Sequence, residues 1–316
     1  MKKVLIADKA DAICERILKE RGLEPVVKTG MKPEELKACI AGFDAIIVRS
    51  ATTLTKDLIE AAANLKAVAR AGSGVDNIDV PACTEKKVVV MNTPFGNTVS
   101  TGEHAIAMMM ALARHIPQAN ASTHAGKWEK KKFEGVELTG KTLGVVGCGN
   151  IGGVVVERAL GLKMNVLVYT PNMTAERARK LGAQMAGLDE LYQKSDFITY
   201  HVAMREATKG LLNKEAIAKM KKGVRLINCA RGGIMVEADV KEALLSGQVA
   251  GLACDVFVKE PATEHIFFGM ENVIATPHIA ASTKDAQVTV ARQAAEQIAD
   301  YLLTGKRTHA VNGDKL

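Results

Sequence analysis

The chain of 316 residues exceeds the usual size of one domain, and 47% of it is hydrophobic, which predicts two domains with ample cores. Its 42 Lys and Arg against 35 Asp and Glu give a net charge of +7, but these cations are scattered and no zinc-finger spacing occurs, so we expect no nucleic-acid partner. The six cysteines occur singly and no apolar run is long enough to span a membrane, which predicts a soluble cytoplasmic protein with reduced thiols and no metal.

From the N-terminus onward, short apolar runs alternate with amphipathic stretches. Such alternation is typical of a parallel sheet covered by helices on both faces. It begins long before the glycine-rich segment described below, so we expect it to form a first domain of its own. The predicted strands are 4–7, 25–27, 45–48, 67–69 and 88–91, and the predicted helices are 13–19, 33–40, 57–64 and 81–86.

The longest helical pattern covers residues 100–118. Ser100 with Glu103 three residues later is typical of a capping box, which places the helix start at Ser100. The run Met108-Met109-Met110 is expected to fill core space, because methionines on an apolar helix more often pack than bind a cofactor. We predict that this helix crosses from the first domain to the second.

One segment of the second half changes from an apolar run into three spaced glycines and then into a helix. Gly147 permits the sharp exit from the strand, Gly149 leaves room for a pyrophosphate, and Gly152 lets the helix pack closely on the sheet. The helix opens with Asn150 and Ile151, and its first amides and dipole are expected to face the phosphates. This pattern predicts a dinucleotide-binding turn.

The segments around that turn complete a βαβ unit and continue as a six-stranded, doubly wound Rossmann sheet. The last helix carries apolar residues on one face, and it has no partner once this sheet is finished. We therefore expect it to return to the first domain, which becomes discontinuous: residues 1–98 and 284–316 around 99–283. The predicted strands are 143–146, 165–169, 197–200, 224–228, 251–254 and 272–275, and the helices are 154–160, 188–194, 214–220, 237–246 and 285–302.

Three titratable side chains follow strands of this second domain. Arg231 lies between a strand and two glycines, Glu260 follows another strand, and His278 follows the final one. Each alone has an ordinary structural explanation. Together they suit hydride transfer on a 2-hydroxy acid: histidine exchanges the hydroxyl proton, glutamate orients it, and arginine holds the substrate carboxylate.

The order Arg231, Glu260, His278 after a dinucleotide-binding turn resembles the D-isomer-specific 2-hydroxyacid dehydrogenases. The resemblance implies that these three residues are catalytic, that NAD is the cofactor, and that the discontinuous domain is a flavodoxin-like substrate domain. It extends almost end to end, through residues 48–52, 70–79, 91–94, 126–133, 228–233, 255–261 and 277–283.

The resemblance also implies roles for residues that no local pattern singles out. Asp255 is expected near the nicotinamide carboxamide and Thr208 near the pyrophosphate. Ser73 and Gly74 are expected to offer backbone amides to the substrate carboxylate.

For a phosphorylated substrate, the resemblance implies that Arg49 and a lysine of the 130–132 run, Lys131 or Lys132, meet the phosphate. In this family two subunits pair through the crossover region, which implies a homodimer in which this lysine can reach a neighbour's site. Without the resemblance, three consecutive lysines are simply a solvated basic stretch.

Two positions depart from the family's pattern. Thr170 stands where an acidic residue usually binds the adenosine ribose, which removes the charge that repels a 2′-phosphate. NADP-preferring relatives usually place an arginine directly after that position, and Pro171-Asn172 supplies none; Arg177 and Arg179 are the nearest candidates. We expect NAD use with weakened discrimination against NADP. Ala203 replaces a proline and is expected to alter the adenine pocket.

The resemblance is closest to the branch that oxidises D-3-phosphoglycerate to 3-phosphohydroxypyruvate, the entry to serine synthesis. A glyoxylate or hydroxypyruvate reductase, or another D-2-hydroxyacid dehydrogenase, is the alternative enzyme. A dinucleotide-sensing corepressor that binds protein partners is the alternative from another class, since such relatives can keep the same three residues. Longer relatives append serine-binding regulatory domains; we expect none here, and no serine feedback through one.

Overall fold

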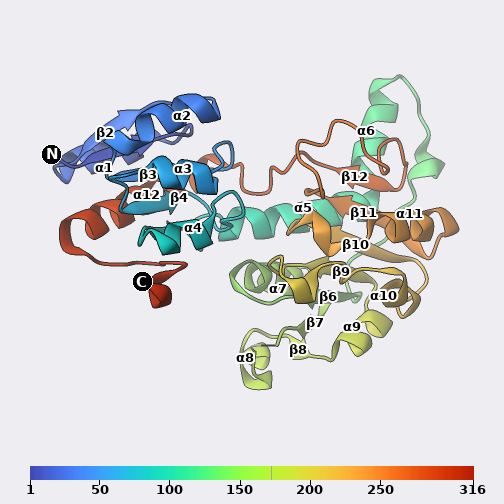
Figure 1. Ribbon diagram of the computed structural model, residues 1–316. Helices are drawn as coiled ribbons and strands as arrows, with labels where there is room; N and C mark the ends of the chain where they lie inside the picture. The colour runs from blue at the N-terminus through green and yellow to red at the C-terminus, as the bar shows by residue number, and fades with distance from the viewer. Residues whose placement is uncertain (172) are drawn as a thin grey trace. The chain divides into compact units, whose positions relative to one another are not determined.

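The computed structural model describes residues 1–171 and 173–316, which divide into two compact units (Figure 1). Unit 1 comprises residues 1–98 and 281–316, and unit 2 comprises residues 99–280. The predicted second boundary, between 283 and 284, lies three residues further along the chain. Asn172, considered above for cofactor choice, lies outside the described residues.

Unit 1 is built on a parallel sheet of five strands in the order β2-β1-β3-β4-β5. This is the flavodoxin-like order, which confirms the predicted α/β class. All five predicted strands form within one or two residues of their expected bounds. They are β1 (Lys3–Ile6), β2 (Glu24–Val27), β3 (Ala45–Val48), β4 (Ala67–Arg70) and β5 (Val89–Asn92).

Helices cover both faces of this sheet because successive strand residues point to opposite faces. Val4 and Ile6 pack in one core with α1 (Ala12–Glu20) and α12 (Lys284–Thr304). Leu5 packs in another core with the remaining helices. Four buried residues of α12, spaced for one helix face, join the first core: Val290, Ala294, Ile298 and Leu302. The helices of the second core are α2 (Pro33–Cys39), α3 (Lys56–Ala61) and α4 (Val80–Glu85).

Unit 2 contains a parallel sheet of seven strands in the order β12-β11-β10-β9-β6-β7-β8. Counted from β6, this is the Rossmann order with one added strand. The prediction of six strands missed β8, whose two residues pair with β7 and are too short to show a period. The strands are β6 (Thr142–Val146), β7 (Asn165–Tyr169), β8 (Gln184–Met185), β9 (Phe197–Tyr200), β10 (Val224–Asn228), β11 (Val249–Cys254) and β12 (Val273–Ala275).

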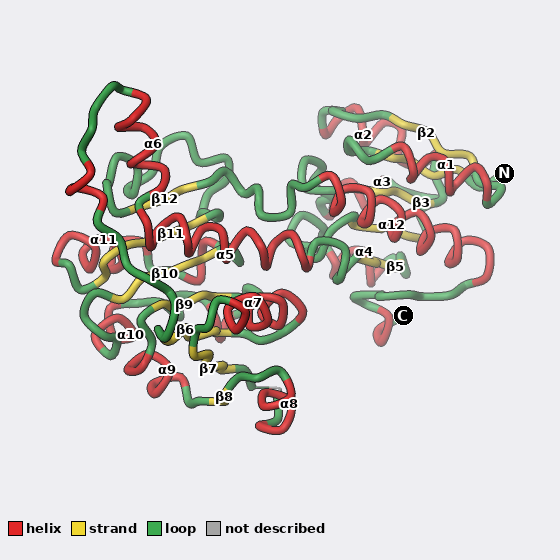
Figure 2. The backbone as a smooth tube through the Cα atoms, turned by 180° about the vertical axis from the view of Figure 1, so that it is seen from behind, coloured by secondary structure: helices red, strands yellow, loops and turns green. Residues whose placement is uncertain are grey.

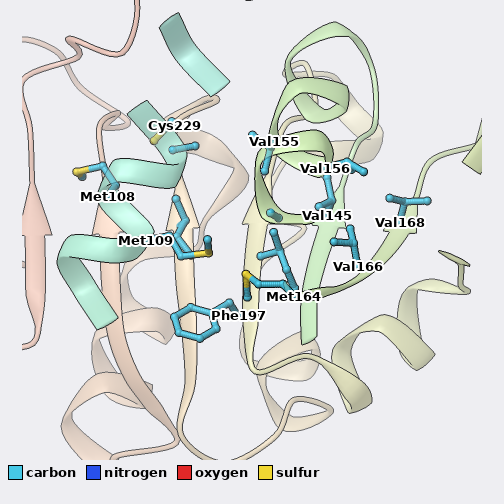
Figure 3. Packing of buried hydrophobic residues seen from close by; sticks show 14 of the residues in the cluster. Met108, Met109, Val145, Val155, Val156, Met164, Val166, Val168, Phe197 and Cys229 are labelled. Atoms are coloured by element: carbon cyan, nitrogen blue, oxygen red, sulfur yellow. The ribbon is translucent and has the colours of Figure 1, made fainter. Parts of the chain in front are cut away.

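Two cores flank the unit 2 sheet. On one face, Met108 and Met109 of α5 (Thr98–Arg114) and Val155 of α7 (Asn150–Gly161) pack among strand side chains (Figure 3). The other face packs against helices that follow later strands. These are α9 (Leu188–Lys194), α10 (Lys214–Ala218) and α11 (Glu237–Ser246), while α8 (Ala175–Lys180) contributes Ala178 to the first core.

The long crossover helix differs from its prediction in three ways. It begins at Thr98, so Ser100 lies inside the first turn and is not the N-cap. It ends at Arg114, because His115 adopts a left-handed conformation with φ +53°. Of the methionine run, Met110 is 43% exposed and does not fill the core.

After the break, α6 (Ile116–His124) and the segment that follows it extend from the rest of unit 2 (Figure 2), and the chain returns at Val136, whose amide donates to the Ala113 carbonyl at 2.9 Å. None of the residues of α6 is buried, and Trp128 beyond it is 87% exposed. The segment includes a short 3₁₀ helix, η2 (Lys130–Phe133). Within the described residues, the longest helices are too short or too polar to cross a lipid bilayer.

Candidate active site

The predicted catalytic and cofactor residues of unit 2 follow one line of register across the sheet. Val146 pairs with Tyr200, Tyr200 with Asn228, Asn228 with Cys254, and Cys254 with Ala275. The chain leaves each of these parallel strands at the same edge. Strand order reverses between β6 and β9, and this reversal point is where doubly wound sheets bind ligands.

At this edge the glycine turn has the close contacts that its sequence predicts. Gly147 has φ +94°, and a Cβ added there would lie 2.6 Å from the carbonyl oxygen of His201. A Cβ on Gly152 would lie 2.2 Å from the carbonyl oxygen of Gly147. Both contacts are with backbone atoms, so no side chain fits at either position.

The middle glycine of the motif, Gly149, faces open space. An added Cβ on Gly149 would meet no atom within 4 Å, and both Gly149 and Asn150 are exposed. The first hydrogen bond within α7 joins the Gly153 amide to the Gly149 carbonyl at 2.9 Å. The amides before Gly153, including that of Ile151, therefore belong to the helix end that carries partial positive charge, as a pyrophosphate site requires.

Thr170 directly follows β7, beside the glycine turn, and is half-buried. The Tyr169 carbonyl before it accepts the Gly147 amide at 2.8 Å, so the ends of β6 and β7 are joined. Thr208 lies in the loop after β9, where its hydroxyl donates to the Ala203 carbonyl at 2.7 Å and accepts from the Arg205 amide at 2.9 Å. This hydroxyl holds its own loop in shape.

Glu260 and His278 are in direct contact. Oε2 of Glu260 lies 2.6 Å from Nδ1 of His278, and Oε1 accepts the Phe257 amide at 3.0 Å. The glutamate is thus held from one side and orients the imidazole from the other. A histidine whose Nδ1 is bound by a carboxylate has Nε2 left for proton exchange with a substrate.

His278 is in a left-handed conformation, with φ +53°, in a turn that Asp255 holds. Oδ1 of Asp255 accepts the Thr276 hydroxyl at 2.6 Å and the Ile279 amide at 2.8 Å, and Oδ2 accepts the Ala280 amide at 2.8 Å. The carboxylate is fully buried. In this structure Asp255 supports the histidine turn; its predicted nearness to the nicotinamide carboxamide remains a prediction.

Asp255 also has a partner on the crossover helix. Nε2 of His104 lies 3.5 Å from Oδ1 of Asp255 and 3.3 Å from the Thr276 hydroxyl. Burial raises the pKa of Asp255, but hydrogen bonds from His104, Thr276 and the two amides outweigh burial and bring the pKa below its usual value. The carboxylate therefore remains an acceptor for the whole turn.

Arg231 extends from the loop after β10, at the same edge of the sheet. Its carbonyl accepts the Asn228 side-chain amide at 2.9 Å, and its Nη1 donates to the Ala230 carbonyl at 2.7 Å. A Cβ on the next residue, Gly232, would lie 2.0 Å from the carbonyl carbon of Phe257. The arginine loop thus lies directly against the segment that carries Glu260.

The candidate carboxylate and phosphate residues of unit 1 lie in loops after strands of its own sheet. The Arg49 amide donates to Oδ2 of buried Asp8 at 2.5 Å, and its Nη1 donates to the Lys9 carbonyl at 2.9 Å. Burial lowers the pKa of Arg49 from its very high usual value. Ser73, which precedes Gly74, donates its hydroxyl to Oδ1 of Asn97 at 2.6 Å.

The two candidate lysines differ in their surroundings. Nζ of Lys132 lies 3.0 Å from Oε1 of Glu271, and this ion pair raises the pKa of the lysine. Lys131 is exposed. Within unit 2, therefore, Lys132 already has an anionic partner.

Sequence reasoning missed the residues that support the site. Asp8, His104, Glu237 and His265 each bind or contact a loop that carries a predicted site residue. Asp8, His104 and Glu237 lie far along the chain from the loops they support, and His265 shares the loop of Glu260 without any spacing that signals a role. Among the described residues no cluster of three His, Cys, Asp or Glu side chains could hold a metal ion.

Comparison with known proteins identifies the family. Residues 106–280 match the family model of the D-isomer specific 2-hydroxyacid dehydrogenase, NAD binding domain. The chain belongs to this dehydrogenase family. The predicted resemblance is confirmed, and unit 2 contains the family's NAD-binding domain.

Proteins similar to this chain include D-3-phosphoglycerate dehydrogenases. The protein of that name from Synechocystis is 48% identical over 99% of this chain and 56% of its own length. The one from Archaeoglobus fulgidus is 48% identical over 98% of this chain and 59% of its own length. The chain thus spans little more than half the length of these relatives.

Solved structures agree with the fold. The NAD⁺-bound 3-phosphoglycerate dehydrogenase of Entamoeba histolytica is 30% identical, with a TM-score of 0.84 over 98% of each chain. A glyoxylate reductase from Paecilomyes thermophila is 26% identical, with a TM-score of 0.90 over 99% of each chain.

Proposed function

We propose that this dehydrogenase oxidises D-3-phosphoglycerate to 3-phosphohydroxypyruvate with NAD⁺, releasing NADH and a proton. The observation that carries the proposal is the 2.6 Å contact between Glu260 and His278 at the sheet edge that also holds the glycine turn. The choice of substrate is supported by relatives of that name at 48% identity.

The residues present fit a dinucleotide. Gly149 leaves open space at the start of α7, and Gly152 brings the helix end within contact of the turn. Gly147, Asn150 and Ile151 complete the proposed pyrophosphate site, with Thr208 in the next loop of the same edge. When bound, the nicotinamide supplies the hydride acceptor.

The three catalytic candidates divide the remaining work. Nε2 of His278 accepts the proton of the substrate hydroxyl as the hydride leaves, and returns it in the reverse direction. Glu260 stabilises the imidazolium that forms and fixes which nitrogen faces the substrate. Arg231 pairs with the substrate carboxylate through its planar fork and polarises the developing carbonyl. For unit 1, the family resemblance implies that the amides of Ser73 and Gly74 bind a substrate carboxylate.

Arg49 and a lysine of the 130–132 run are proposed to bind the substrate phosphate. Lys131→Ala is expected to raise KM for 3-phosphoglycerate about tenfold, the loss of about 1.4 kcal/mol of charge-assisted binding. Lys132→Ala should have a smaller effect because Lys132 already pairs with Glu271. The matched substrate D-glycerate, which lacks the phosphate, should show no change; equal rises in KM for both substrates would contradict a phosphate role.

The cofactor is proposed to be NAD with weak discrimination against NADP. Thr170 offers a hydroxyl but no charge at the position where relatives carry an acid. Comparing kcat/KM for the two cofactors tests this directly. The preference for NAD is expected to increase in Thr170→Asp, since the added carboxylate would repel a 2′-phosphate; a large preference of the parent protein for NADP would reject the proposal.

One experiment separates the candidate functions. Initial rates are measured with 3-phosphoglycerate, D-glycerate and D-lactate, with the keto acid of each, and with glyoxylate, in every case with both cofactors. Fast turnover of 3-phosphoglycerate supports the proposal, and fast reduction of glyoxylate or hydroxypyruvate supports the second candidate, favoured by the fold match to a glyoxylate reductase. NADH binding without any turnover would favour a dinucleotide-sensing corepressor. His278→Asn is the control and should reduce turnover by about 100-fold or more.

The protein is also proposed to be a homodimer. Helix α6 has no buried residue, and an isolated helix of nine residues is not stable in water, so a second copy is the proposed cover. We infer a cytoplasmic location from the six free cysteines. Burial raises the pKa of Cys14, Cys83 and Cys254 to about 12, so these thiols stay protonated.

A further inference from the structure

Behind Glu260, a second carboxylate and a second histidine form a buried contact. Nε2 of His265 lies 3.1 Å from Oε1 of Glu237, with side chains only 9% and 21% exposed. Glu237 is the first residue of α11, and His265 lies in the loop that leads towards β12. The proposed reaction gives neither residue a role.

The His265 ring is held by contacts on several sides. Its Nδ1 accepts the Phe267 amide at 3.4 Å, and its buried Nε2 lies 3.1 Å from Oε1 of Glu237 without the geometry of a hydrogen bond. Three aromatic rings surround it, with centroids 4.9 to 5.6 Å away: Phe267, Phe257 and Phe268. These ring contacts pack His265 between Glu237 and the Phe257 side chain.

This contact reaches Glu260 through the backbone. Oε1 of Glu237 also accepts the Val258 amide at 3.3 Å, while the neighbouring Phe257 amide donates to Oε1 of Glu260 at 3.0 Å. Two adjacent backbone amides, those of Phe257 and Val258, are therefore bound by two different glutamates. The position of the Phe257 amide, and with it Glu260, depends on what binds Val258.

The same backbone segment lies against the arginine loop. An added Cβ on Gly232 would lie 2.0 Å from the Phe257 carbonyl carbon and 2.4 Å from the Val258 nitrogen. A shift of residues 257–258 would therefore also press on the residue next to Arg231. A change at Glu237 or His265 can therefore affect two of the three catalytic loops, those of Arg231 and Glu260.

We propose that Glu237 and His265 are positioning residues: together they hold the Phe257–Val258 peptide so that Glu260 points at Nδ1 of His278. The inference rests on the proposed function only for its kinetic readout. The geometry itself is a statement about how Glu260 is aimed, and it can be measured without substrate.

The kinetic test uses Glu237→Ala and His265→Phe, with Glu242→Ala as a matched control. Glu242 lies on the same helix and is exposed, paired with Lys214 at 3.6 Å. Both test variants are expected to lower kcat about tenfold, part of the roughly 100- to 10,000-fold that a positioned acid–base group supplies, with unchanged Kd for NADH. The control should keep parent kcat. Glu237→Gln keeps an oxygen for the Val258 amide and should recover most of the activity.

A double-mutant cycle with Glu260→Gln decides whether the pair acts through Glu260. If it does, Glu237→Ala in the Glu260→Gln background lowers kcat by less than about twofold, because the aimed carboxylate is already lost. A full, multiplicative loss in that background overturns the proposal. Parent-like kcat in both Glu237→Ala and His265→Phe also overturns it.

The second readout needs no turnover. The short Glu260–His278 contact predicts a downfield proton resonance for the His278 Nδ1–H in the apoprotein, absent in Glu260→Gln. This resonance should weaken or shift in His265→Phe, a variant that keeps the aromatic packing, and stay unchanged in Glu242→Ala. An unchanged resonance in His265→Phe overturns the proposal even if Glu237→Ala fails to fold, whereas Glu237→Gln, which keeps the oxygen, is expected to retain the resonance. If no 2-hydroxy acid is turned over, the proposed function fails while this measurement still decides the positioning role.

Discussion

At His278, an unfavourable backbone conformation is offset by hydrogen bonds to a neighbouring side chain. A non-glycine residue at φ +53° loses roughly 1 to 2 kcal/mol relative to ordinary helical or extended conformations. Asp255 offsets that loss with three hydrogen bonds, to the Thr276 hydroxyl and the Ile279 and Ala280 amides. The strain and its compensation lie in different parts of the chain, on either side of β12.

Asp255→Asn tests this balance. In this variant an NH2 group replaces one carboxylate oxygen of Asp255. The backbone amide of Ile279 or Ala280 that donated to that oxygen then has no acceptor. We expect a loss of about 1 to 3 kcal/mol in the free energy of unfolding and a lower kcat. Denaturant titration measures the first. Asp189→Asn, on an exposed ion pair with Lys219, is the control and should change stability by less than about 0.5 kcal/mol. Equal stability of the two variants would contradict the role given to Asp255.

His201, at the end of β9, predicts a pH dependence of stability. Burial lowers the pKa of His201 from 6.5 to about 4, so the folded state binds its proton less well than the unfolded state. Stability from this group is therefore complete above about pH 6.5 and is lost as pH falls towards 4. The loss is about 3 kcal/mol at most.

The measurement compares the parent with His201→Gln by chemical denaturation between about pH 7 and 4. The stability advantage of the parent should shrink steadily over that interval, because only the parent takes up a proton on this imidazole when it unfolds. The carboxylates titrate in both proteins, so their contribution cancels in the difference between the two free energies of unfolding. A constant difference across the range would show that His201 titrates normally.

At the scale of elements, the start of α7 is set by two neighbouring glycines with opposite surroundings. A Cβ at Gly152 would lie 2.2 Å from a backbone oxygen, whereas a Cβ at Gly153 would meet no atom within 4 Å. Gly152→Ala must move the helix end away from the turn. The proposed pyrophosphate site would move with it.

We expect Gly152→Ala to raise the Kd for NADH by about tenfold or more, equivalent to roughly 1.4 kcal/mol. Gly153→Ala is the matched control, since it should leave the Kd unchanged and stabilise the helix by about 0.5 to 1 kcal/mol. Fluorescence titration of NADH measures both variants. Similar Kd values for the two would mean that the helix end does not contact the cofactor.

At the scale of the whole molecule, the exposed arm that follows α5 comprises α6 and η2, residues 116–133. Nothing within unit 2 explains why this arm exposes apolar side chains. Ile116 and Trp128 are both largely exposed on a segment in which α6 buries nothing. Exposed apolar residues gathered on one arm are typical of an interface between subunits.

Ile116→Asp combined with Trp128→Ala is therefore expected to convert a dimer into monomers, because a charge replaces apolar contact at the interface. Light scattering after size-exclusion chromatography gives the mass. Leu245→Asp, on the exposed side of α11, is the control and should remain dimeric. A monomeric parent protein, or a dimeric double variant, would place the interface elsewhere or exclude it.

The sequence alone determined those features that depend on neighbours along the chain. All described strands except β8 follow from short apolar runs between amphipathic stretches, and the glycine turn follows from the backbone approaches that only Gly147 and Gly152 permit. The order of Arg231, Glu260 and His278 placed each of them after a strand of one parallel sheet, whose carboxyl ends share an edge. Local chemistry was sufficient because each pattern lies within a few residues.

Tertiary structure decided what depends on pairs far apart in the chain. Strand β8 exists because β7 offers it a partner. The end of the crossover helix, by contrast, has a local signal that the prediction passed over, since Pro117 follows His115 by two residues. Asp255 supports the turn of His278, and Glu237 meets His265, because the parallel strands bring separate loops to one edge. A carboxylate acquires its role from the donors that the folded chain places around it, and those donors are not its neighbours in sequence.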